Sequence, residues 1–142
     1  MVLTAGKIQA APALYDIIIS KRLTKKSRKG FRGWPMATIA FYGPDLSRAS
    51  KVAVGIIETQ DGEPTEMRSW HSDVADVRHD SAIGEEILAF IEGHDVKSVS
   101  MAVGIIGCSH QEGIDYEGEW CPVCDFWKGR DRFTGKMLPG FQ

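Results

Sequence analysis

All three cysteines of the chain lie between positions 108 and 124, together with one histidine, as Cys108-Ser-His110 and Cys121-Pro-Val-Cys124. Thiolate and imidazole groups are ligands that zinc takes in tetrahedral sets of four, and three cysteines with one histidine form one of its standard structural sites. The two-residue gap between Cys121 and Cys124 lets both sulfurs face one ion. The sequence therefore predicts a Zn²⁺ site built from Cys108, His110, Cys121 and Cys124.

The two halves of this cluster are not equally regular. A zinc ribbon has two residues between the ligands of each half, whereas one residue separates Cys108 from His110, and Asp125 stands where a ribbon usually has glycine. If the His110 ring points elsewhere, Asp115 or a water molecule would complete the site. His110 is therefore the residue on which a closed structural site and an open catalytic site differ.

Two catalytic motifs share part of this pattern. His110-Gln-Glu112 followed by Cys121-Pro-Val-Cys124 partly matches the zinc deaminase signature, in which the glutamate moves protons for an activated water. The stretch between Glu112 and Cys121 is too short for the strand that separates the deaminase helices, and Cys108 would be left over. The Cys-Pro-Val-Cys motif also matches a thioredoxin-like dithiol, but too little chain follows it to complete that fold. Both fit less well than a closed zinc site.

Length and composition limit the fold to one domain. The chain has 142 residues, of which 43% are hydrophobic, enough for one core with appended segments. No apolar run approaches the roughly 18 to 20 residues of a membrane span. The sequence therefore favours a soluble protein without a membrane partner. Three cysteines form no even disulfide framework, which favours a reducing, cytoplasmic compartment.

The net charge of -2 conceals an uneven distribution. Residues 1–35 hold eight of the 17 basic groups and one of the 19 acidic groups, which leaves nine basic and eighteen acidic groups for the rest of the chain. A basic N-terminal extension thus precedes an acidic body. The extension could bind nucleic acid or another anionic surface, lie on the acidic body, or be a disordered or wrongly assigned start, because regular patterning begins at Met36.

From Met36 onward the hydrophobic pattern predicts regular elements. Alternating apolar residues separated by turn signals predict three antiparallel strands, over residues 38–42, 51–58 and 65–70. The polar stretch 71–80 is expected to be a surface connection.

A helix and a fourth strand complete this pattern. Asp80 or Ser81 is placed to cap the helix, Gly93 is placed to end it, and a stripe of apolar residues between them should face the core. The strand is expected where four apolar residues alternate before Gly107, namely Val99, Met101, Val103 and Ile105.

A five-residue string occurs twice, at 53–57 and 102–106. The flanking residues differ, so no internal repeat follows. Both copies are predicted to be central strands, with Gly55 and Gly104 marking places where a helix or an aromatic ring approaches the backbone closely.

The predicted fold class is α+β, with an antiparallel three-stranded meander, one core helix, a fourth, parallel strand and a C-terminal zinc-binding loop. We expect residues 1–35 to form the basic extension, 36–107 the α+β core and 108–142 the zinc-binding segment packed on that core.

This order of strands and helix resembles the first half of a ribonuclease H-like fold. That resemblance implies a nuclease with two divalent ions between carboxylates on the first strand, the first helix and the end of the fourth strand. Here Asp45 follows the first strand, Glu85 and Glu86 lie on the helix, and no carboxylate ends the fourth strand. The catalytic set is not matched, and Glu85 and Glu86 suit a solvated helix face.

The segment after Gly107 reads Cys-x-His-x-Glu-Gly-x-Asp-Tyr and then Cys-Pro-x-Cys-x-Phe-Trp. It is similar to a group of small uncharacterised bacterial zinc-site proteins that begin near an equivalent of Met36. The resemblance spans residues 36–136 and implies zinc binding without supplying an activity.

Aromatic residues gather around the cluster and could serve nucleic-acid stacking or packing on the sheet: Tyr116, Trp120, Phe126, Trp127 and Phe133. The same stretch is rich in acidic residues, which repel phosphates, so packing is favoured. We expect a binding or regulatory module with a structural Zn²⁺ and an unidentified protein or nucleic-acid partner. The alternative is a metal-dependent hydrolase or nuclease that uses an open zinc or Asp45, Glu85 and Glu86.

Overall fold

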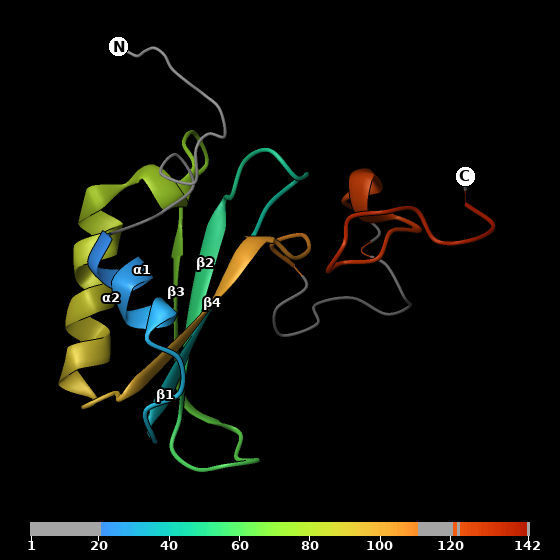
Figure 1. Ribbon diagram of the computed structural model, residues 1–142. Helices are drawn as coiled ribbons and strands as arrows, with labels where there is room; N and C mark the ends of the chain where they lie inside the picture. Colours follow the sequence, from blue (N-terminus) through green and yellow to red (C-terminus); the bar gives the residue numbers. More distant parts are fainter. Residues whose placement is uncertain (1–20, 111–120, 122, 142) are drawn as a thin grey trace.

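The computed structural model describes residues 21–110, 121 and 123–141. Within them the chain forms an α+β fold with a four-stranded sheet (Figure 1). The elements in chain order are α1 (Lys21–Arg28), β1 (Met36–Tyr42), β2 (Lys51–Ile57), β3 (Pro64–His71), the 3-10 turn η3 (Val77–His79), α2 (Ser81–Gly93), β4 (Ser98–Ile105) and the 3-10 turn η4 (Asp125–Trp127).

The strands lie in the order β3-β2-β1-β4. β1 and β2 pair antiparallel, as do β2 and β3, whereas β4 pairs parallel to β1. The predicted meander with a fourth, parallel strand is thus confirmed. On one face of the sheet Ile39 lies opposite Val54, and Phe41 opposite Val52. All four side chains are buried, as their alternation in the sequence predicts.

Helix α2 packs its apolar stripe on this face. Asp80 caps the helix, because its Oδ1 accepts the Ile83 amide at 3.1 Å, which satisfies one of the free N–H groups of the first turn. Ile83, Ile87, Leu88 and Ile91 are buried, and Phe90 is partly buried against the core. The helix ends at Gly93. The expected cap, stripe and end are all confirmed.

Residues 21–35 contain an element that hydrophobic patterning did not predict. Helix α1 lies on the same side of the sheet as α2 (Figure 1), and its Leu23 is fully buried in the common core. Behind it, the Arg32 amide donates to Ser98 Oγ at 2.7 Å, and Ser98 Oγ donates to the Gly33 carbonyl at 2.7 Å. This part of the basic extension therefore contributes Leu23 to the hydrophobic core that it shares with the sheet.

The connection at 71–80 is mostly exposed or half-buried, as expected of a surface stretch, but two of its residues are buried. Val77 and Arg78 are buried, and Arg78 forms an ion pair with Asp76 in which Nη2 and Oδ2 are 2.6 Å apart. Asp76 also accepts the amides of Ala49 and Arg78. Arg78 can be buried within this otherwise exposed connection because its side chain is bonded to Asp76.

The second copy of the repeated string is not in a central strand. β4 is an edge strand, and its pairing with β1 shifts between Ile39 and Phe41. This irregularity breaks the expected alternation, so that Val103 is 82% exposed although Ile105 is buried. A Cβ on Gly104 would meet no atom within 4 Å, whereas one on Gly55 would lie 2.8 Å from the Met67 sulfur. The group that approaches Gly55 is thus a side chain of the neighbouring strand β3 and not the expected helix or aromatic ring, and no group approaches Gly104.

Among the described residues, none of the helices is both long and apolar enough to span a membrane.

Candidate metal centre

The cluster lies just beyond the end of β4. Gly107 follows the strand with a φ of 133°, a conformation that residues with a Cβ rarely adopt, and its carbonyl accepts the Gly43 amide at 2.9 Å. The chain turns there, and Cys108 is consequently buried with no exposed surface. His110 ends the described part of this half-site, and Cys121 and Cys124 supply the other half from the start of the C-terminal segment.

The four side chains converge on one point. The sulfur atoms of the three cysteines and a ring nitrogen of His110 all lie within 4.8 Å of one another. His110 Nδ1 is 3.4 Å from Cys121 Sγ and 3.5 Å from Cys124 Sγ. A tetrahedral zinc with bonds of about 2.3 Å to sulfur and 2.0 Å to nitrogen would separate such atoms by roughly 3.5 Å. The two distances from His110 therefore fit a tetrahedral ion, the four residues are near enough to bind one metal ion, and His110 points into the cluster.

Backbone amides already stabilise negative charge on two of the sulfurs. The amides of Val123 and Cys124 donate to Cys121, and the amide of His110 donates to Cys108. In each half-site, the first cysteine accepts backbone N–H groups from the turn that carries the second ligand. The bond from His110 explains how a half-site with a single intervening residue can close.

The acidities of the three thiols differ. Burial raises the pKa of Cys108, and burial together with the neighbouring Cys108 and Cys121 raises the pKa of Cys124 to about 12. Burial also opposes ionisation of Cys121, but the donated amide bonds outweigh it and lower the pKa of that thiol. Without a cation the cluster therefore carries fewer than three negative charges, and all three cysteines are free of disulfides.

The C-terminal segment is attached to the sheet through Gly43, which follows β1. The buried Trp127 donates its indole N–H to the Gly43 carbonyl at 2.9 Å, and the Gly43 amide binds Gly107. A Cβ at Gly43 would collide with the Arg48 carbonyl oxygen, so the tight turn requires glycine. Arg132 adds a third link, from Nε to the Ile106 carbonyl at 3.2 Å.

A buried lysine supports the cluster from β2. Lys51 is 7% exposed, and its Nζ donates to the carbonyl of Ser109 at 3.1 Å, between the two ligands of the first half-site. The same ammonium lies 5.7 Å from the centre of the Tyr42 ring. A dication with three thiolates and a neutral imidazole has a net charge of -1, so a cation placed here offsets that charge.

Beyond η4 the chain folds back on itself. The Arg130 guanidinium lies 4.2 Å from the centre of the Phe126 ring, and its Nη1 donates to the Gly135 carbonyl at 2.8 Å. Asp131 Oδ1 accepts the amides of Phe133 and Thr134. These bonds hold the segment that carries Cys124 without a large apolar core.

The carboxylates of the alternative nuclease site are not brought together. In the described part of the chain, the cysteine and histidine cluster is the only group of three or more potential metal ligands, and it includes none of Asp45, Glu85 and Glu86. Asp45 accepts the amide and hydroxyl of Ser47, whereas Glu86 accepts the Trp70 indole at 3.0 Å. These carboxylates have local structural partners.

The aromatic residues near the cluster do not act alike. Trp127 is buried and Phe126 packs partly against the core, as expected for packing on the sheet, whereas Phe133 is 72% exposed. Glu112, Asp115, Tyr116 and Trp120 lie outside the described residues, so the expectations attached to them stay predictions.

Lys51 and Gly43 are parts of the site that the sequence pattern did not reveal. A lysine at the start of a valine-rich strand gives a weak signal, because such a position is usually solvated. The centre is thus a Cys-His-Cys-Cys group near enough to bind one metal ion, attached to the sheet by Gly43, Lys51 and Ile106. No protein-family model, curated protein or solved structure matches this chain.

Proposed function

We propose that Cys108, His110, Cys121 and Cys124 hold a structural Zn²⁺ and that the protein acts as a small binding or regulatory module. The observation that carries this proposal is the convergence of one nitrogen and three sulfur atoms within 4.8 Å. Four protein ligands fill the tetrahedral positions of zinc, and so no position is left for a reacting water. Soft thiolates also favour zinc over magnesium or calcium.

The surroundings of the site support a structural role. Cys108 and Cys121 are members of the hydrophobic core cluster, so metal binding and packing of the C-terminal segment stabilise the same contacts. Thiolate ligands have to stay reduced, which suits a reducing compartment such as the cytoplasm. In this arrangement the ion positions residues 123–141 against the end of the sheet, and the surface so formed would meet the partner.

The first test is the metal content of the full-length protein purified under reducing conditions. We expect about one zinc per chain, and in the cobalt-exchanged protein the intense visible absorption of a tetrahedral thiolate site. His110→Ala should retain some metal but change the cobalt spectrum, because water would replace the imidazole. His71→Ala, which removes an exposed histidine on β3, is the matched control and should leave both properties unchanged.

The same measurements can contradict the proposal. Wild-type protein that binds zinc no better than a variant lacking Cys121 and Cys124 would exclude the site. A cobalt spectrum identical in wild type and His110→Ala would show that the fourth ligand is not this imidazole. In that case the open, catalytic site would become the better description.

A further inference from the structure

The second functional feature lies away from the cluster, at the beginning of the described chain. Residues 21–35 contain seven basic side chains and no acidic one. We call five of them the basic strip: Lys25, Lys26, Arg28, Lys29 and Arg32. In the part of the chain that the structure describes, no acidic side chain pairs with a member of this strip, whereas Arg22 pairs with Glu92.

The strip is held on a rigid support. Leu23 anchors α1 in the core, and α1 packs against β4. Arg32 and Gly33 are tied through Ser98 to the start of the same strand. Lys25, Arg28, Lys29 and Arg32 are exposed. The helix dipole accounts for cations in the last turn of α1, but it does not account for those that continue beyond the end of the helix.

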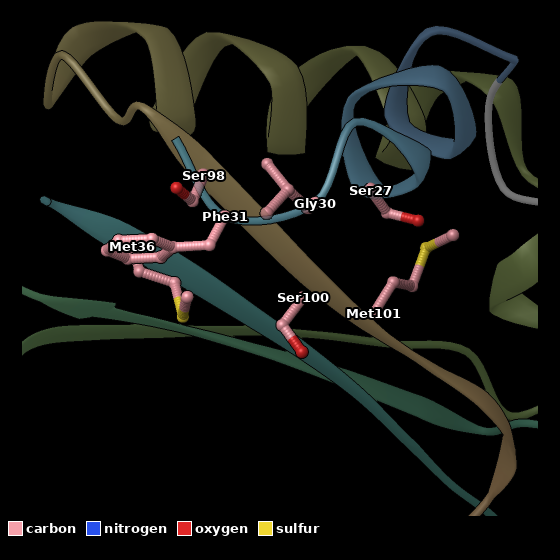
Figure 2. Close-up of a pocket in the computed structure, with 8 residues that line it drawn as sticks. Ser27, Gly30, Phe31, Met36, Ser98, Ser100 and Met101 are labelled. Atoms are coloured by element: carbon pink, nitrogen blue, oxygen red, sulfur yellow. The ribbon is translucent and has the colours of Figure 1, made fainter. Parts of the chain in front are cut away.

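A pocket of about 300 Å³ opens between this segment and β4. Figure 2 shows Phe31 and Met36 at one end of the pocket and Ser27 and Met101 at the other. The wall thus combines a ring and two thioether side chains with the hydroxyl groups of Ser27 and Ser100. Phe31 is 60% exposed and is fixed by an edge contact to Trp34, with ring centres 5.3 Å apart.

We propose that the basic strip and this pocket bind single-stranded nucleic acid, with phosphates on the cations and a base beside Phe31. Positive grooves with an exposed aromatic ring are the usual means of binding a single strand, because every base has a flat face that can stack. A pocket of this size is at the lower end for ligand sites and suits one small planar group.

An anionic membrane is the competing partner, and the structure argues against it. A helix that inserts into a lipid surface needs an exposed apolar face. The apolar residue of α1, Leu23, faces the core instead. Of the 19 acidic residues, 18 lie after residue 35, so a strand of phosphates is attracted to the basic strip and repelled by the acidic body.

The test uses full-length protein and a fluorescent oligouridylate, followed by anisotropy at several salt concentrations. We expect binding that weakens as the salt concentration rises. The slope of the logarithm of the binding constant against the logarithm of the salt concentration should become shallower by about 0.7 for each phosphate contact removed. Lys25→Gln with Lys29→Gln should therefore weaken binding and reduce the slope. Lys128→Gln with Lys136→Gln makes the same charge change on the C-terminal segment and should have little effect.

A second variant tests the pocket. Phe31→Ala should weaken binding roughly fivefold to a hundredfold, because stacking on one base is lost, while the salt slope stays the same. Circular dichroism of each variant verifies that the fold is kept. Equal effects of the two lysine pairs, full binding by Phe31→Ala, or binding to phosphatidylglycerol vesicles but not to the oligouridylate would each overturn the proposal.

Discussion

The sheet and the C-terminal segment are held in place by different kinds of interaction. Between β1 and β4, the core is built from buried aliphatic and aromatic side chains on the paired strands of the sheet. After Ile105, the buried apolar side chains in the described residues are Cys108, Cys121 and Trp127. The sheet thus depends on buried area, whereas the segment depends on a few directed contacts.

The difference shows what a metal ion would contribute to a chain of this size. The segment has too few aliphatic residues to offset the entropy of ordering it through burial alone. One ion that binds four side chains can supply that free energy at a single point. The bonds to Gly43, Lys51 and Ile106 then fix the orientation of the segment on the sheet.

The largest effect is expected from removing one of the two candidate ligands at the start of the segment. Cys121→Ser should lower the bound metal from about one ion to near zero. It should also abolish hydrogen-exchange protection in residues 123–141, because structural zinc supplies about 10 kcal/mol or more in small domains. Protection in β1 and β2 should persist. If the two regions lost protection together in this variant, they would form one cooperative unit, and the contrast between them would be wrong.

A large loss of stability that leaves the metal site unaffected is expected from replacing Asp76. Asp76→Asn leaves the buried Arg78 guanidinium without its charged partner, and should lower the free energy of unfolding by about 3 kcal/mol. Metal content should not change. Asp73→Asn, an exposed carboxylate in the same connection, is the control and should shift the denaturation midpoint little.

Asp76 should also make the free energy of unfolding depend on pH. Burial opposes ionisation of Asp76, but bonds from Arg78 and from the Ala49 amide outweigh it and lower the pKa of this carboxyl below 3.8. Its stabilising contribution is therefore complete above about pH 4 and is lost as the pH falls through the folded-state pKa. The range from about pH 6 to about pH 3 spans the ordinary titration of an aspartate. Over this range, urea denaturation should show a smaller loss of unfolding free energy in Asp76→Asn than in wild type.

An intermediate effect is expected at the contact that joins the two regions. Trp127→Phe removes the indole N–H and leaves the buried Gly43 carbonyl without its donor, at a cost of about 1–3 kcal/mol. Zinc affinity should fall by a corresponding factor, while the cobalt spectrum keeps its shape. Phe133→Ala, at an exposed ring of the same segment, should change neither property. An affinity unaffected by Trp127→Phe would mean that the ion holds the segment independently of the sheet.

The smallest effect is expected at the surface pair between α1 and α2. Arg22 and Glu92 are 2.9 Å apart, but their side chains are 62% and 49% exposed. Arg22→Gln should lower the free energy of unfolding by about 0.2–1 kcal/mol, and less in high salt. A loss as large as that of Asp76→Asn would show that α1 depends on this ion pair more than on the burial of Leu23.

Much of the sheet could be predicted because its signals are local. The alternation around Ile39 and Val54 and the cap at Asp80 depend on neighbouring residues in the sequence. Helix α1 was missed, because Leu23 is its single buried residue and a lone apolar side chain gives no periodicity. The exposure of Val103 was missed for another reason. A bulge is produced by the pairing of β4 with β1, which the sequence of β4 alone does not report.

The sequence by itself determined the group of candidate metal ligands, because cysteine and histidine at such spacing supply soft ligands, and it determined the order of the strands and the core-facing helix along the chain. Tertiary structure decided that His110 points into the cluster, that Lys51 donates a hydrogen bond to the loop between its first two ligands, and that helix α1 with its basic residues packs against β4. The physical reason is distance along the chain. Ligand type and periodicity are local properties, whereas the direction of a side chain and the charge beside it depend on segments that meet only when the protein folds.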